Sequence, residues 1–187
     1  MPAESRPGHF HAVQFYQDEA SLTRIVAEFL AEGMAVGDPA VVIATPEHLA
    51  LIETTLQERA INVEAMKRLG DLILLDARET LATFMVDGLP HAGTFKYVIT
   101  EALNQVRRGR QDATIRAYGE MVNVLWKDGL EAAAIRLETL WNELANSHDF
   151  KLLCGYSMGN FYKGAAIEEI KGQHSHLVRE SGTASIN

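Results

Sequence analysis

A tyrosine, a glycine and a carboxylate stand in a row at Tyr118, Gly119 and Glu120. The residues from Thr114 to Tyr118 are expected to form a strand, so the row lies where that strand ends. Ligands of open parallel sheets bind at this edge, and a carboxylate is well placed there. We therefore predict that Tyr118 and Glu120 line a ligand site. The alternative is that Glu120 is simply an acidic residue at the start of the next helix.

Aromatic and acidic side chains follow other expected strands in the same way. Tyr16 ends the first apolar stretch, Glu47 follows the second, and Tyr156 ends the last. Parallel strands end at a common edge of their sheet, so these groups could form one pocket. Aromatic walls with a few charged groups are the usual composition of a small-molecule site.

Histidines and the single cysteine could also carry chemistry. His9 and His11, like His174 and His176, are spaced two residues apart, and such a pair on a strand could hold a metal ion. Terminal pairs of this kind are usually solvated, so we expect no metal ion and no cofactor. Cys154 would be a nucleophile only beside a base such as His11 in an electropositive niche. The apolar run around Cys154 instead favours a buried thiol and no catalytic residue.

The chain has the alternation of strands and helices that a parallel sheet requires. Five stretches are predicted to be strands: His11–Tyr16, Val41–Ala44, Leu72–Leu75, Thr114–Tyr118 and Phe150–Tyr156. Apolar residues at helical spacing predict helices over 22–30, 46–59, 81–85, 95–106, 120–126 and 131–144. Strands that are apolar on both faces and joined by helices predict an α/β fold with right-handed crossovers.

The ends of the chain carry weaker patterns. The tail from Phe161 is predicted to be helical and then to lose order, because residues 179–187 show no apolar periodicity. We expect one domain over residues 9–177, with flexible termini at 1–8 and 178–187.

Composition limits the classes of partner. The 187 residues are 47% hydrophobic and carry a net charge of −8 without an acidic block, which argues against a nucleic-acid partner. A single cysteine excludes an internal disulfide and fits a reducing compartment. The sequence shows neither a signal peptide nor an apolar run of membrane-spanning length. We therefore expect a cytoplasmic protein without a membrane partner.

Three stretches resemble the MEDS family, the sensory domain named after methanogens, methylotrophs and a methylotroph repressor. They are HAVQFYQDEASL at 11–22, IRAYGEMVNVLW at 115–126 and LWNELANSHDFKLLCGYSM at 140–158. The resemblance implies a three-layer fold similar to RecA and KaiC, with a parallel sheet flanked by helices. It also implies that a histidine and a cysteine contact the ligand, at positions that match His11 and Cys154 here. The strands that carry these two residues are neighbours in a RecA-like strand order.

RecA-like ATPases place a glycine-rich loop with a lysine directly after the first strand. The corresponding residues here are YQDEASL at 16–22, with no glycine or lysine, and Asp18 and Glu19 would repel phosphate. We therefore predict that the phosphate-binding loop is absent and that ordinary ATPase activity is absent with it.

The resemblance implies a sensor rather than an enzyme, because family members are thought to sense simple hydrocarbon derivatives. We expect a stand-alone sensory domain that binds a small organic ligand and regulates a histidine kinase, a response regulator or a transcription factor. A ligand-free interaction module in such a pathway and a degenerate nucleotide-binding protein are the alternatives. An exposed helix face could also support a homodimer.

Overall fold

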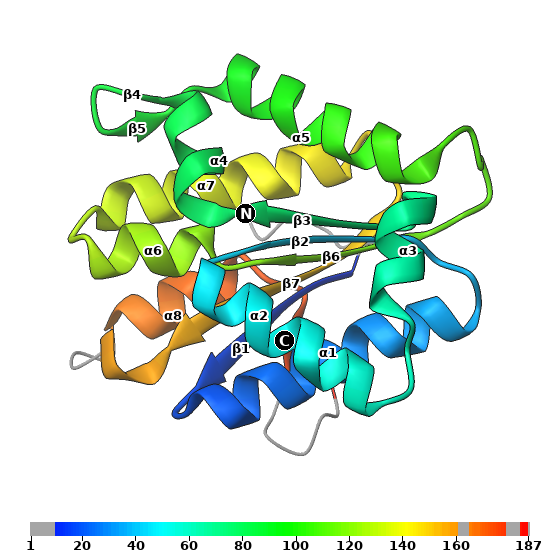
Figure 1. Ribbon diagram of the computed structural model, residues 1–187. Helices are drawn as coiled ribbons and strands as arrows, with labels where there is room; N and C mark the ends of the chain where they lie inside the picture. Colours follow the sequence, from blue (N-terminus) through cyan, green and yellow to red (C-terminus); the bar gives the residue numbers. More distant parts are fainter. Residues whose placement is uncertain (1–9, 161–164, 179–183, 187) are drawn as a thin grey trace.

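A seven-stranded sheet forms the centre of the protein in a computed structural model that describes residues 10–160, 165–178 and 184–186 (Figure 1). The strand order is β3-β2-β6-β7-β1-β8-β9. The first six strands of this order run parallel, and β9 pairs antiparallel with β8. The strands are β1 (Phe10–Tyr16), β2 (Ala40–Ala44), β3 (Leu72–Asp76), β6 (Ile115–Gly119), β7 (Phe150–Ser157), β8 (His176–Val178) and β9 (Ala184–Ile186).

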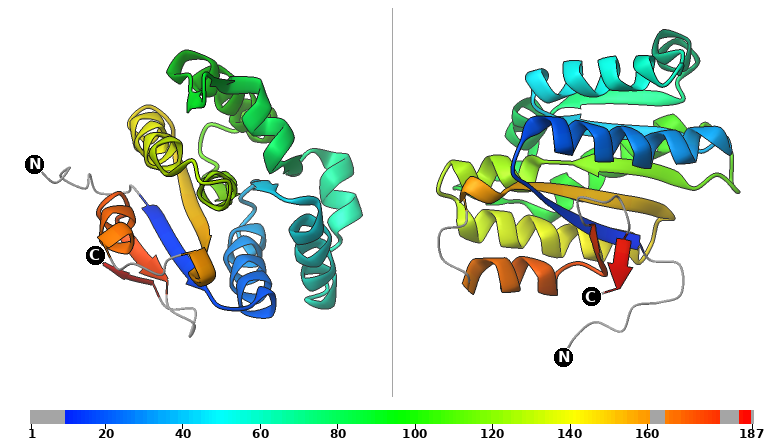
Figure 2. Two further views of the ribbon diagram at one scale, coloured as in Figure 1. Left: turned by 90° about the vertical axis from the view of Figure 1, so that its left-hand side faces the viewer. Right: turned by 90° about the horizontal axis from the view of Figure 1, so that it is seen from below.

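Helices cover both faces of the sheet and give three layers, as the end-on view in Figure 2 shows. One face packs against α1 (Glu19–Ala35), α2 (Pro46–Glu58) and α3 (Val63–Leu69). The other packs against α4 (Ala77–Phe84), α5 (Ala92–Arg107), α6 (Met121–Lys127), α7 (Glu131–Ala145) and α8 (Ala165–Gly172). This confirms the predicted three-layer RecA-like architecture. None of the described helices combines the length and the apolar composition that crossing a bilayer requires.

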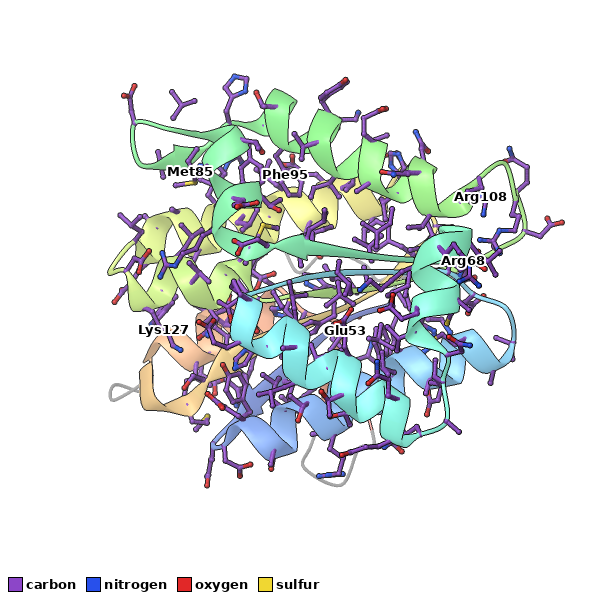
Figure 3. All side chains as sticks on the ribbon, in the orientation of Figure 1. Glu53, Arg68, Met85, Phe95, Arg108 and Lys127 are labelled. Carbon is purple, nitrogen blue, oxygen red and sulfur yellow. The ribbon has the colours of Figure 1, made fainter. Side chains whose placement is uncertain are left out.

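The alternation of side chains along each strand assigns them to the two layers. In β1, Val13 packs under α7 while Ala12 and Tyr16 pack under α1 and α2. The side chains fill the space on both sides of the sheet (Figure 3). Each face of the sheet therefore has its own apolar core.

Helix starts follow the capping residues in the sequence. The side chain of Asp18 accepts a hydrogen bond from the Ser21 amide at the start of α1. The side chain of Asp76 accepts from the Arg78 and Glu79 amides at the start of α4. These bonds use backbone donors that a helix leaves without intrahelical partners, which is why the helices begin there.

Aromatic packing fixes helix α7 over the sheet. The ring of Trp141 lies edge-on to that of Phe95, with centroids 5.2 Å apart, and it also meets Phe150 of β7 at 6.0 Å. Trp141 is 2% exposed. Its neighbours one turn away on α7 therefore also face β7 and β1.

The structure differs from the sequence prediction at several short elements. Helix α3 was not expected. Residues 87–90 were expected to be a turn, and Asp87 and Gly88 do turn with positive φ, but strands β4 (Met85–Val86) and β5 (Leu89–Pro90) flank them. A flexible segment was expected at 178–187, and within it β9 pairs with β8. Residues 1–9 and 161–164, where flexible and helical segments were predicted, lie outside the described part of the chain.

Candidate functional site

The sheet divides the predicted ligand residues between its two faces. Cys154 and Tyr156 lie in the core beneath α7, and His11 contacts Asn142 of that helix. Tyr16 and Tyr118 lie in the core beneath α1 and α2. The single pocket expected from the sequence therefore becomes two separate polar groups of side chains in the structure.

The first group surrounds Glu138 of α7, and we call His11, Glu138, Cys154, Tyr156 and His174 the Glu138 cluster. The Nε2 atom of His11 lies 3.2 Å from Sγ of Cys154 and 3.2 Å from Oε2 of Glu138. The Nε2 atom of His174 lies 3.3 Å from Oε1 of Glu138, and the Tyr156 hydroxyl donates to the same oxygen at 2.7 Å. All five side chains are at most 5% exposed.

The opposite ring nitrogens of the two histidines contact oxygen atoms. Nδ1 of His11 lies 2.8 Å from Oδ1 of Asn142, and Nδ1 of His174 lies 2.6 Å from the carbonyl oxygen of Ile170. The Asn142 side chain is itself held in place, because its Nδ2 donates to the carbonyl oxygen of Gln173 at 2.8 Å. The orientation of both rings is therefore fixed by acceptors outside the cluster.

Burial and charge shift the ionisation of the cluster. Burial raises the pKa of the Cys154 thiol well above its usual value, and the neighbouring carboxylate of Glu138 raises it further. Burial followed by the charge of His174 lowers the pKa of His11. Burial alone would raise the pKa of Glu138, but attraction to His174 and His11 outweighs it and the pKa is lowered. These shifts favour a protonated thiol and an ionised carboxylate.

The second group surrounds Glu120 at the carboxyl edge of the sheet, and we call Thr45, His48, Tyr118 and Glu120 the Glu120 network. Oε1 of Glu120 accepts a hydrogen bond from the Thr45 amide at 2.6 Å. Oε2 accepts from the Tyr118 hydroxyl at 2.9 Å and lies 2.7 Å from Nδ1 of His48. Glu120 is 1% exposed. This carboxylate ties β2, α2 and β6 together, which is a structural use of a residue predicted to meet ligand.

Ionisation within the Glu120 network follows from these bonds. The hydrogen bond to Glu120 raises the pKa of His48, although burial opposes it. Burial raises the pKa of Tyr118 well above its usual value, and the charge of Glu120 adds to this. His48 is therefore favoured as an imidazolium and Tyr118 as a neutral donor.

The remaining predicted residues lie beside this network. The Tyr16 hydroxyl accepts a hydrogen bond from Asn123 Nδ2 at 3.2 Å, and Asn123 Oδ1 accepts one from the Ser157 amide at 3.0 Å. Burial and then the charge of Glu120 raise the pKa of Tyr16. Glu47 is exposed in the first turn of α2 and joins neither group.

The start of α1 shows what replaces a phosphate-binding loop. The carboxylate of Asp18 accepts from the Ser21 amide at 2.7 Å and from the Ser21 hydroxyl at 3.1 Å. An acidic side chain of the protein thus occupies the helix start, where a RecA-like ATPase would bind phosphate.

Comparison with known families follows from this fold and these groups. A family model described as "MEDS: MEthanogen/methylotroph, DcmR Sensory domain" matches residues 10–175. The match begins with β1 and continues past His174, so it contains every residue of both polar groups. The chain belongs to the MEDS family. A comparison with curated proteins finds no match.

Family membership gives this MEDS protein a sensory role. It also confirms the resemblance carried by the stretches at 11–22, 115–126 and 140–158, all of which lie inside the match. His11 and Cys154, whose strands were expected to be neighbours, do lie on adjacent parallel strands, with Val13 opposite Cys154.

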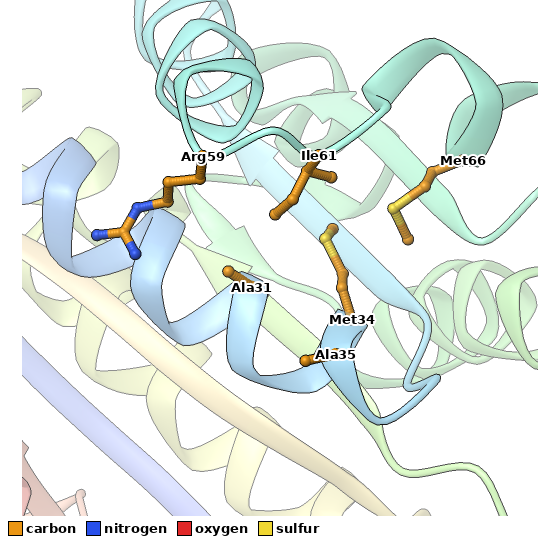
Figure 4. A pocket seen from close by; sticks show the side chains of 6 residues that line it. All are labelled: Ala31, Met34, Ala35, Arg59, Ile61 and Met66. Carbon is orange, nitrogen blue, oxygen red and sulfur yellow. The ribbon is translucent and has the colours of Figure 1, made fainter.

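Two surface pockets of the MEDS protein lie away from both polar groups. One of about 420 Å³ is formed by the end of α1, the α2–α3 turn and α3 (Figure 4). It is lined by Ala31, Met34, Ala35, Arg59, Ile61 and Met66. Another of about 280 Å³ lies between α1 and the starts of β1, β6 and β7. None of the seven predicted ligand residues lines either pocket.

The predicted ligand residues did not include Glu138, Asn142, His174 or His48. Glu138 had a detectable signal, because it stands at helical spacing among the buried residues Ala134, Leu137 and Trp141. An acid on an apolar helix stripe is rarely buried without a partner. His174 was noticed only as one of a pair with His176, because its place beside Glu138 depends on how the chain after α8 returns to β1.

Proposed function

We propose that this MEDS protein recognises a small organic molecule of the hydrocarbon-derivative class at the Glu138 cluster and passes the signal to a partner protein. The contact of 3.2 Å between His11 Nε2 and Cys154 Sγ carries the proposal. These are the two positions at which family resemblance implies ligand contact. They meet in a polar centre inside an apolar core. Burying polar groups costs free energy unless they are hydrogen-bonded, and buried groups with shifted pKa values are common at functional sites.

A ligand reaches the cluster by displacing the segment that covers it. His174 follows α8, and Ile170 of α8 is fully buried. The Ser175 amide and hydroxyl both bond to the carbonyl oxygen of His11, so the same segment is attached to β1. Ligand binding at the cluster therefore shifts α8 and β8, and that movement presents a changed surface to a histidine kinase, response regulator or transcription factor.

Titration calorimetry with a panel of short-chain halogenated, hydroxylated and carbonyl compounds tests the proposal. Hydrogen exchange of α8 amides is measured with each compound that binds. We expect binding to raise or lower α8 exchange, and Cys154→Ala to weaken binding while Glu101→Gln on the exposed face of α5 does not. A panel without heat, or binding that Cys154→Ala leaves intact, contradicts the proposal. Loss of binding in Glu120→Gln alone would place the ligand at the carboxyl edge.

One surface observation favours the interaction module as a second candidate. The β4–β5 hairpin exposes Val86 at 55% and Leu89 at 50%, and these residues pair with each other. Tyr97 on α5 is 67% exposed. A double variant Val86→Ser and Leu89→Ser should abolish capture of a signalling partner if the hairpin binds it, and sedimentation of the same variant shows whether a homodimer uses this surface instead.

A further inference from the structure

The Glu138 cluster contains four side chains of the types that bind transition metals. His11 comes from β1, Glu138 from α7, Cys154 from β7 and His174 from the turn after α8. One donor atom from each residue can be chosen so that all four lie within 4.8 Å of one another. Each of the four side chains is at most 5% exposed, so water does not compete freely for the donors.

Several distances between donors are close to the edges of a tetrahedral site. His11 Nε2 lies 3.2 Å from Cys154 Sγ, and Sγ lies 3.8 Å from Glu138 Oε2. Both histidine Nε2 atoms lie 3.2 to 3.3 Å from a Glu138 oxygen. Bond lengths of about 2.0–2.1 Å to nitrogen and oxygen and about 2.3 Å to sulfur separate the donors of tetrahedral zinc by about 3.3–3.6 Å.

The histidine rings present their Nε2 atoms to the centre of the cluster. The oxygens of Asn142 and Ile170 that meet the Nδ1 atoms of His11 and His174 can only accept hydrogen bonds. Each Nδ1 therefore carries a hydrogen, and the Nε2 atom of each ring is the nitrogen that points toward Glu138 and can bind a metal ion. Metal-binding histidines are oriented in this way by acceptors on their other nitrogen.

The arrangement of donors at this centre suits a cation. The two carboxylate oxygens face two imidazole nitrogens, and the cysteine sulfur lies beside them. A divalent ion at the centre would replace these contacts with four metal bonds and release any proton held on the Nε2 atoms. Coordination by sulfur requires the thiolate, so the Cys154 proton passes to the buffer as the metal–sulfur bond forms.

We propose that His11, Glu138, Cys154 and His174 bind a divalent late first-row transition metal ion such as Zn²⁺. Two imidazoles, one thiolate and one carboxylate suit such an ion, whereas Mg²⁺ and Ca²⁺ prefer sites made of oxygen. Tyr156 and Asn142 orient the carboxylate and one imidazole.

The site differs from the histidine pairs noticed in the sequence, because it takes one member of each pair. His9 lies outside the described residues, and the His176 ring packs on Phe10 with centroids 4.5 Å apart. The inference does not depend on an organic ligand.

Cobalt absorption and zinc calorimetry on the full chain, prepared with a chelator that is then removed, test the site. We expect one equivalent of Co²⁺ to give the intense visible bands of a tetrahedral ion and a thiolate-to-cobalt charge-transfer band. Zn²⁺ should displace the cobalt. Cys154→Ser should remove the charge-transfer band, and Asn142→Ala should weaken Zn²⁺ binding by about 10–100-fold through loss of ring orientation.

The matched pair His174→Gln and His176→Gln separates this site from adventitious binding by histidine. We expect His174→Gln to lose tight binding and His176→Gln to keep it, with circular dichroism confirming that both are folded. Wild-type protein that is folded but binds no stoichiometric metal overturns the inference and leaves a hydrogen-bonded cluster that holds a proton. Equal binding by the two variants also overturns it. Repeating the organic panel on metal-free and metal-loaded protein keeps failure of the metal site distinct from failure of ligand sensing.

Discussion

Two buried glutamates lie on opposite faces of one sheet. The residue types around them are similar, but their carboxylates have different hydrogen-bond partners. Glu120 and Glu138 each receive a hydrogen bond from a tyrosine hydroxyl and each contact histidine. Glu120 also receives a backbone amide, from Thr45, and its histidine is favoured in the charged form. Glu138 instead lies between the Nε2 atoms of two histidines and beside the Cys154 sulfur. A carboxylate held by a backbone amide and a hydroxyl ties elements of the fold together, whereas a carboxylate grouped with two imidazoles and a thiol has the donors of a metal site.

Removing the Glu120 carboxylate should have the largest effect on stability. Glu120→Ala leaves the Thr45 amide, the Tyr118 hydroxyl and the His48 imidazolium without their acceptor. Breaking a buried pair in this way costs about 3–5 kcal/mol, so we expect that loss in the free energy of urea unfolding. Glu101→Ala, on an exposed helix face, should change it by less than about 0.5 kcal/mol. A small effect of Glu120→Ala would show that the network is not structural.

Metal should stabilise the protein through Glu138 and not through Glu120. At Zn²⁺ concentrations of about 100 times the dissociation constant, the free energy of unfolding should rise by about 2.7 kcal/mol. Glu138→Gln should stay folded, because the new amide can donate to His11 Nε2, but should lose this increment. Thermal unfolding with and without Zn²⁺ measures both. A Zn²⁺ increment that persists in Glu138→Gln would remove the distinction between the two glutamates.

A substitution at Gly155 tests whether the position of the Tyr118 ring contributes to stability. A Cβ at Gly155 would lie 2.5 Å from the Tyr118 hydroxyl, whereas one at Gly119 meets nothing within 4 Å. Gly155→Ala should therefore push Tyr118 away from Glu120 and cost about 1–3 kcal/mol, as overpacking usually does. Gly119→Ala is the matched control in the neighbouring strand, and equal unfolding free energies for the two variants would contradict this account.

His48 should give the Glu120 network a pH dependence of about 1–2 kcal/mol, the range of a hydrogen bond to a charged group. Its pKa is raised in the folded state, so its contribution is fully present below the unfolded pKa of 6.5 and is lost as pH rises through the folded pKa. Glu120 and Glu19 favour its charge, and Lys127 opposes it. His48→Gln should therefore destabilise the protein more at pH 6 than at pH 9. A loss that does not change with pH would mean that His48 is neutral.

Most of the fold was predictable because its signals are local. Apolar runs, capping residues and glycine stops lie within one element, and they placed the five central strands and most of the helices. Helix α3 and strands β4, β5, β8 and β9 were missed because they are short, and their stability comes from pairing or packing rather than from periodicity.

The candidate sites were predictable only in part. His11 and Cys154 came from family resemblance and do meet, since their strands pair directly. Tyr118 and Glu120 were correctly expected at the strand end, but they bond to each other and to Thr45 and His48 of the same protein. Joining all seven residues into one pocket was wrong, because the alternation of side chains along β1 and β7 sends Tyr16 and Cys154 to opposite faces.

The sequence by itself determined the order of strands and helices, the acidic replacement of the phosphate-binding loop and the family. Each of these follows from residues that are close together in the sequence. Only the tertiary structure decided that His11 and His174, 163 positions apart in a sequence of 187 residues, share one carboxylate from a third segment. Such a meeting depends on how α7 is fixed over the sheet by Trp141 and on how the chain after α8 returns to β1. The physical reason is that periodicity specifies which face an element buries, whereas the choice of neighbour on that face is made by packing.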